Sequence, residues 1–185
     1  MVDLKKILSL VVITGAAAAL IVWTVISFSF RSPIAAFLVN WLVMSWIVLM
    51  GQVVDFPPFS PVYYEIKPFE QSGHLYERLG IRLFKKIVRR GPLTIFSPTL
   101  RFSTEKTAEA LEHLTHEMRK AETSHAVIFL VILLPIGYAF IRGWFDAAAW
   151  LLLFNILLNG YPVMLQRYNR IKMRELKPIE QENRR

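Results

Sequence analysis

The sequence predicts an all-α membrane protein with about four transmembrane helices and further amphipathic or interfacial helices on the cytoplasmic side. More than half of the 185 residues are apolar and the mean hydropathy is +0.39, although 19% of the residues are charged. A wholly soluble domain does not have this composition. The apolar residues gather in four runs, near residues 7–30, 33–54, 126–142 and 144–166. Each run is about as long as the hydrocarbon core of a bilayer requires.

The first run follows Lys5 and Lys6, as the apolar core of a secretory signal peptide would. Its roughly 24 apolar residues exceed the usual length of such a core, so we interpret the run as a retained span. The chain has no cysteine. This excludes disulfides, thiolate metal sites and a cysteine nucleophile.

The positions of the 22 Lys and Arg residues predict the orientation in the membrane, because cytoplasmic loops near helix ends retain positive charge. Eleven of them lie between positions 55 and 125 and seven after position 166, whereas the two short connections hold only Arg31 and Arg142. We therefore expect a multi-pass protein of the cytoplasmic membrane with both termini in the cytoplasm. The net charge of +8 beside four spans favours anionic lipid or an acidic substrate over nucleic acid.

The middle of the chain, residues 55–125, is expected to be a cytoplasmic interfacial segment. It would belong to one membrane domain, residues 1–185, that ends in a polar tail at 171–185. Four prolines and five aromatic residues between positions 55 and 72 predict an extended connector at headgroup depth.

Two helices are predicted within this segment. The first is amphipathic, runs from Leu75 to Arg90 and is stopped by Gly91 and Pro92. Its basic face is interpreted either as a means of membrane adhesion or as a wall that binds the phosphates of a donor substrate. The second helix is expected to begin at Ser103 or Thr104, whose hydroxyls can cap free amides.

The densest group of chemically versatile side chains lies where the second of these helices meets the third span. It comprises His113, His116, Glu117, Glu122 and His125. A polar side chain at the entrance of a span is costly unless it is used or paired, which favours a functional role for Glu122 and His125. A histidine held by a carboxylate can take a proton from a hydroxyl. We therefore predict His125 as a general base that is oriented by Glu122 or Glu117.

Two other interpretations of this group stay open. His113 and His116 fit ordinary solvated partners on a cytoplasmic helix. Alternatively, all five side chains bind a metal, because imidazole and carboxylate groups three or four residues apart on a helix are a familiar set of ligands. Their spacing is not that of the HExxH motif, and His74 is the only further candidate ligand. We expect no bound metal or organic cofactor.

A second polar group lies in and after the fourth span. Asn155, Asn159, Gln166 and Arg170 fall on one face of a helix, although Pro162 is expected to distort its later part. A polar stripe inside lipid serves either helix packing or substrate binding. Gln166 to Arg170 then place five polar side chains at the cytoplasmic boundary, where arginines clamp a phosphate or carboxylate or extend to the headgroups.

Three motifs resemble one known family. ExxxAExxH, formed by Glu117, Ala121, Glu122 and His125, is followed some forty residues later by QRYNR at 166–170, and FExxG begins at Phe69. These motifs are similar to those of the glycosyl-4,4'-diaponeurosporenoate acyltransferase family of staphyloxanthin synthesis, over roughly residues 60–174. The resemblance implies an enzyme that esterifies a sugar hydroxyl of a membrane glycolipid or glycosylated isoprenoid with a fatty acyl chain.

An acyl-enzyme is not indicated, because no serine stands in a GxSxG context, and an activated substrate hydroxyl fits better. The expected partners are membrane lipids, a lipid-linked acceptor and an acyl thioester co-substrate, either acyl-CoA or an acylated carrier protein. The candidate substrate-binding residues are Asn159, Gln166, Arg167, Tyr168, Asn169, Arg170, His74 and Glu70. A metal-dependent membrane hydrolase and a non-enzymatic protein that binds lipid or a partner are the alternatives.

Overall fold

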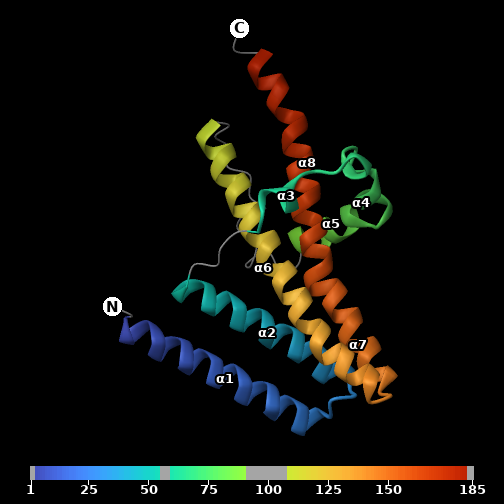
Figure 1. Ribbon diagram of the computed structural model, residues 1–185. Coiled ribbons are helices and arrows are strands. Elements are labelled where there is room, and N and C mark those ends of the chain that lie inside the picture. Colours follow the sequence, from blue (N-terminus) through green and yellow to red (C-terminus); the bar gives the residue numbers. More distant parts are fainter. Residues whose placement is uncertain (1–2, 55–58, 91–107, 183–185) are drawn as a thin grey trace. The chain divides into compact units, whose positions relative to one another are not determined.

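The computed structural model describes residues 3–54, 59–90 and 108–182. Every regular element in these ranges is a helix (Figure 1). Within them, four helical stretches are long and apolar enough to cross a membrane: Leu4–Phe28, Pro33–Val53, Glu112–Ile141 and Phe145–Arg174. The prediction of an all-α membrane protein with four spans is therefore confirmed.

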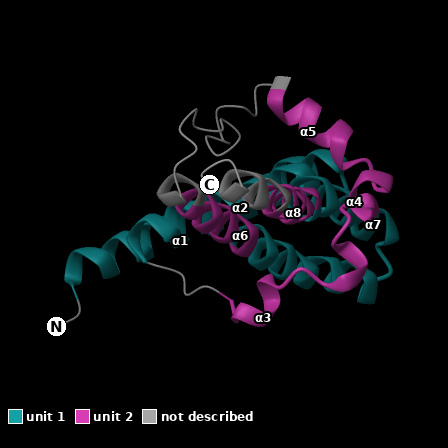
Figure 2. Ribbon diagram, turned by 90° about the horizontal axis from the view of Figure 1, so that it is seen from above, with its two compact units in different colours: residues 1–57, 124–160 teal, residues 58–123, 161–185 magenta. Residues whose placement is uncertain are grey.

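The chain divides into two compact units (Figure 2). Unit 1 comprises residues 1–57 and 124–160, and unit 2 comprises residues 58–123 and 161–185. The third helical span, α6 (Ala108–Ile141), contributes residues to both units. Compact units need not fold independently, so the single membrane domain stays a prediction.

Unit 1 begins with two long apolar helices, α1 (Leu4–Phe28) and α2 (Pro33–Val53), which pack against each other (Figure 1). The Asp3 side chain caps α1 by accepting from the backbone N–H of Lys5. Ser32 caps α2 in the same way, and Pro33 follows at the first helical turn, where its missing N–H costs nothing. These caps place the start of each span close to the start of its apolar run.

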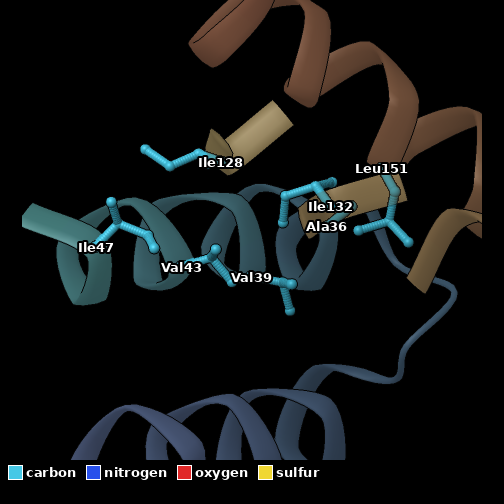
Figure 3. Packing of buried hydrophobic residues seen from close by; sticks show 7 residues of the cluster. All are labelled: Ala36, Val39, Val43, Ile47, Ile128, Ile132 and Leu151. Carbon is cyan, nitrogen blue, oxygen red and sulfur yellow. The ribbon is translucent and has the colours of Figure 1, made fainter. Parts of the chain in front are cut away.

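The core of unit 1 is formed by α2, the later part of α6 and α7 (Phe145–Asn155). Figure 3 shows its buried side chains, spaced three or four residues apart along α2 so that they share one face. They are Ala36, Val39, Val43 and Ile47 of α2, Ile128 and Ile132 of α6, and Leu151 of α7. Most apolar side chains of α1 are exposed, as expected for a helix surrounded by lipid.

A turn of π-helix, η4 (Ile156–Gly160), follows α7 directly. Pro162 lies two residues beyond it and has no N–H, so it cannot donate to the carbonyl of Leu158 as a continuous α-helix requires. Such wide turns are frequent at functional sites. The distortion expected near Pro162 thus falls on the segment that contains Asn159.

Unit 2 contains α3 (Pro61–Tyr64), the short 3₁₀ helix η1 (Pro68–Glu70), α4 (His74–Arg78), α5 (Ile81–Arg90), the first part of α6 and α8 (Tyr161–Glu182). The predicted extended connector is corrected for its described part, residues 59–72. Two helical turns interrupt it, and each begins with a proline, whose fixed φ suits the first position of a helix.

The single amphipathic helix predicted from Leu75 to Arg90 is also corrected. It is divided into α4 and α5 because Gly80 adopts a positive φ of 80°, which no right-handed helix accommodates. Ile81 and Val88 of α5 are buried within unit 2. The predicted stop at Gly91 and Pro92 and the predicted start at Ser103 or Thr104 lie outside the described residues.

Candidate active site

The carboxylate of Glu122 lies at the centre of a buried ionic cluster in unit 2. Its side chain is fully buried, with 0% exposure. One oxygen accepts a hydrogen bond from Nε of Arg167 at 2.8 Å, and the other accepts from Nη2 of Arg170 at 2.6 Å. The cluster therefore joins α6 to α8, since the two arginines follow one another on the same face of α8.

A second carboxylate, that of Glu70, completes the cluster. It accepts from Nη1 of Arg167 at 3.1 and 3.2 Å, from the backbone N–H of Lys67 at 2.8 Å, and from the hydroxyl of Tyr76. Burial by itself would raise the pKa of Glu70, but the hydrogen bonds from Tyr76 and Lys67 and the charge of Arg167 outweigh it. The pKa of Glu70 is consequently below its usual value, so this carboxylate is ionised.

The tyrosines of α3 close the cluster from the side of the connector. Arg167 donates to the carbonyl oxygen of Tyr63, and Arg170 donates to that of Tyr64 at 2.7 Å. Each guanidinium also lies over the ring of the same tyrosine, 5.1 and 5.6 Å from the ring centres. Burial and the charge of Glu122 raise the pKa of Tyr63 to about 12, so this phenol is neutral at physiological pH.

Two buried polar atoms beside the cluster have no hydrogen-bond partner among the described residues. They are Oε1 of Gln166 and Nε of Arg170, and their residues are 8% and 4% exposed. Buried polar atoms are almost always paired in folded proteins. One acceptor and one donor, a single helical turn apart on α8, are thus left without a protein partner among the described residues.

His125 belongs to a different polar chain, located in unit 1. Nδ1 of its imidazole lies 3.3 Å from Oδ1 of Asn159. The amide nitrogen of Asn159 donates to Oδ1 of Asn155 at 3.0 Å, and the amide nitrogen of Asn155 donates to the carbonyl oxygen of Phe129 at 3.0 Å. Both asparagines are fully buried, and the His125 ring is partly buried.

These hydrogen bonds between His125, Asn159, Asn155 and Phe129 fix which nitrogen of the imidazole carries the proton. The carbonyl of Phe129 can only accept, so Asn155 must present its NH₂ group there and its oxygen to Asn159. Asn159 in turn presents its oxygen to His125, and Nδ1 must donate. In the neutral imidazole, Nε2 of His125 therefore keeps its lone pair. A neutral imidazole held in this way can act as a general base.

His125 and Glu122, which the sequence predicted to act as a pair, form hydrogen bonds with different residues. Glu122 accepts from two arginines, and His125 contacts Asn159. The role of Glu122 or Glu117 in orienting His125 stays a prediction, while Asn159 occupies the place of an orienting group. Glu117 is partly buried.

The remaining histidines are on the surface. His113 and His116 are exposed on α6, and His74 is exposed at the start of α4. Among the described side chains, no group of three or more His, Asp or Glu residues is arranged to hold a metal ion. The geometry therefore brings no support to the alternative of a metal-dependent hydrolase.

The other predicted binding residues lie on α8, next to α5. The amide oxygen of Asn169 accepts from Nζ of Lys85 at 2.9 Å, and the hydroxyl of Tyr168 donates to Glu77 at 2.8 Å. Sequence reasoning missed the contributions of Tyr63, Tyr64 and Tyr76 to the ionic cluster. For Tyr63 and Tyr64, the high aromatic content of the connector was the available signal, and it indicated headgroup depth instead.

The family model of glycosyl-4,4'-diaponeurosporenoate acyltransferase matches residues 60–177, which is more than half of the chain. The matched region contains Glu70, Glu122, His125, Asn159 and both arginines of the cluster. No curated protein and no solved structure matches.

Proposed function

The chain belongs to the glycosyl-4,4'-diaponeurosporenoate acyltransferase family, and on this basis we propose that it transfers a fatty acyl chain to a sugar hydroxyl of a membrane glycolipid or glycosylated isoprenoid. Family membership assigns acyl transfer in carotenoid biosynthesis, and the four apolar helices assign the membrane. The sugar acceptor and the fatty acyl thioester are parts of the proposal.

The observation that carries the proposal is the position of His125. Its Nδ1–H donates to Asn159, so Nε2 is the basic nitrogen. His125 lies at the entrance of an apolar span, which is where a lipid-linked acceptor would present its hydroxyl. An ester forms when an alcohol oxygen attacks the carbonyl carbon of a thioester. A positioned base at such a step contributes about 10²–10⁴-fold in rate.

The proposed step conserves atoms and charge. The acceptor hydroxyl passes its proton to Nε2 of His125 while its oxygen bonds to the thioester carbon. The tetrahedral intermediate then expels the thiolate as the C–S bond breaks, and the imidazolium returns the proton to that sulfur. His125 ends neutral, ready for another cycle, and no acyl-enzyme is formed.

The unpaired atoms of Gln166 and Arg170 support a binding role for α8. Oε1 of Gln166 would accept from a sugar hydroxyl and Nε of Arg170 would donate to a carbonyl or hydroxyl oxygen once the side chains that enclose these two atoms move aside. Arg167 and Arg170 are each already paired with a buried carboxylate, so their charges hold the connector in place rather than a free headgroup.

We further propose that both termini and the segment 55–125 are cytoplasmic. The proposal is supported by the distribution of the Lys and Arg residues, most of which lie in this segment and after the fourth span. In this orientation a thioester made in the cytoplasm reaches the protein directly.

Mass spectrometry of cellular lipids tests the proposed function. Cells that make the wild-type chain, the His125→Gln variant or the His113→Gln variant at equal membrane levels are supplied with a glycosylated carotenoid acid. His113 is the matched control, because it is an exposed histidine on the same helix. We expect the acceptor to gain a fatty acyl mass with the wild type and His113→Gln, and not with His125→Gln. An unchanged acceptor in wild-type cells contradicts the proposal.

A further inference from the structure

A cationic groove in unit 2 has no part in the proposed transfer of the proton. It has a volume of about 530 Å³, within the range of small-molecule sites. Four cationic side chains of α5 and one aromatic ring of α8 line it: Arg82, Lys85, Lys86, Arg89 and Tyr168. Four positive side chains at one groove repel one another, so the site is suited to an anion.

The cations of α5 form a stripe beside its buried face. Positions 82, 85, 86 and 89 cover an arc of about 100° on the helix. The exposed apolar residues Leu83 and Ile87, 63% and 55% exposed, lie on another side, centred about 130° away from this stripe. If Leu83 and Ile87 enter the lipid, the stripe is directed away from the membrane. Adhesion to headgroups would instead place the cations at the edges of the apolar surface.

Contacts with α8 and α4 hold the groove in shape. Nζ of Lys85 donates to Asn169 at 2.9 Å and lies 6.0 Å from the ring centre of Tyr168. The Tyr168 hydroxyl donates to Glu77, whose carboxylate also accepts from Arg82 at 2.7 Å. Glu77 therefore offsets one of the four charges, and the groove keeps a net positive charge.

The environment of Lys85 is electrostatically unfavourable to its own charge. Burial, and then the nearby charge of Arg89, lower its pKa below the usual value. An anion bound in the groove would offset the charge of Arg89 and so raise the pKa of Lys85 again. A polyanion in the groove would thus offset the mutual repulsion of these four side chains.

We propose that the groove binds clustered phosphate groups, and, given the acyl transfer proposed above, that they belong to an acyl thioester that carries a phosphorylated nucleotide, of the coenzyme A class. Arginine offers a planar fork to phosphate oxygens and lysine a point charge, and the stripe holds two residues of each type. A carrier protein would present carboxylates over a broad surface, whereas this groove is small enough for a compact polyanion.

Binding of adenosine 3',5'-bisphosphate to the full chain in phosphatidylcholine nanodiscs tests the proposal. The test variant Lys86→Gln/Arg89→Gln removes two exposed charges of the groove, so its fold should be kept. The control variant Arg78→Gln/Lys120→Gln removes two exposed charges elsewhere in unit 2. We expect saturable binding to the wild type and the control, and binding about tenfold weaker or more to the test variant, since hydrogen bonds to charged groups are lost. Raised salt should weaken the binding.

Three results would overturn the proposal. One is the absence of saturable binding to the wild type, and another is equal affinity in the test variant. The third concerns a lipid source of phosphate. If the wild type retains phosphatidylglycerol, the test variant loses it and the bisphosphate does not bind, the groove binds lipid headgroups instead.

The same material separates this proposal from the proposed function. His125→Gln should bind the bisphosphate as the wild type does, because His125 belongs to unit 1 and does not line the groove. Bisphosphate binding without any acyl transfer would leave the groove standing and reject the proposed function. Acyl transfer by a wild-type protein that does not bind the bisphosphate and is not inhibited by it would support the proposed function and reject the groove as the binding site.

Discussion

Glu122 and Arg170 form a buried ion pair at 2.6 Å, with side chains that are 0% and 4% exposed. Removal of one partner from such a pair leaves an uncompensated buried charge, which costs about 3–5 kcal/mol. We therefore expect Glu122→Gln to lower the thermal unfolding temperature of the detergent-solubilised protein markedly. Glu112→Gln is the control, since Glu112 is exposed on the same helix, and it should leave the temperature unchanged. Equal unfolding temperatures for the two variants would refute the structural role of the cluster.

The lowered pKa of Glu70 predicts a pH dependence of stability. A carboxyl group whose pKa is lower in the folded state contributes stability that is fully present above its unfolded pKa, about 4.3 for Glu, and is lost as the pH falls through the folded value. The free energy of unfolding of the wild type, minus that of Glu70→Gln, should thus shrink from pH 6 to pH 3. Glu65→Gln, which removes an exposed carboxylate, should show a smaller change. A difference for Glu70→Gln that is constant with pH would contradict the assignment.

Gly73 has a positive φ of 73°, and a Cβ atom there would lie 3.2 Å from Cε2 of Tyr168. Gly73→Ala should therefore destabilise the protein by about 1–2 kcal/mol, because a left-handed backbone is strained for alanine. Gly137→Ala is the opposite case: the site is inside α6, and apart from the adjacent residues and the backbone of the helix itself no atom lies within 4 Å of the added Cβ. Its unfolding temperature should be unchanged or higher. Equal loss of stability in both variants would show that the conformation of Gly73 does not matter.

The hydrogen bonds that run from the Phe129 carbonyl through Asn155 and Asn159 to His125 predict the tautomer of the imidazole. Nitrogen NMR of ¹⁵N-histidine-labelled protein should show His125 protonated at Nδ1 and unprotonated at Nε2. Asn159→Leu removes the acceptor, so we expect a mixed tautomer and a lower kcat with little change in KM. The control is Asn40→Leu, another fully buried asparagine of unit 1, whose amide contacts Ala36 and Leu151. A wild-type signal protonated at Nε2 would contradict the proposed base.

The sequence was sufficient for the spans, because the length and apolarity of a run directly determine whether a helix crosses the bilayer. It also singled out His125, Glu122 and Asn159, since polar side chains in apolar runs stand out. Their pairing could not be predicted. His125 and Asn159 are 34 positions apart, and Glu122 and Arg170 are 48 apart. Which of several polar residues meet depends on the rotation of each helix and on the π-helical turn η4, which no periodicity reveals.

The errors in unit 2 have local causes. The periodicity of residues 75–90 continues through Gly80, whose backbone conformation breaks the helix all the same. Proline was interpreted as a residue of extended chain, yet Pro61 and Pro68 each begin a helical turn. The carbonyl groups of α3 that bind the arginines carry no sequence signal, since every residue has one.

The central claim is that His125 acts as the base in acyl transfer, and the turnover of purified His125→Ala tests it most directly. The variant is assayed in nanodiscs with an acyl thioester and a glycosylated acceptor, next to the wild type and His113→Ala, after equal unfolding temperatures have been verified. Loss of a positioned base predicts a fall in kcat of about 10²–10⁴-fold for His125→Ala and wild-type turnover for His113→Ala. A His125→Ala enzyme that is correctly folded and turns over at the wild-type rate would contradict the account.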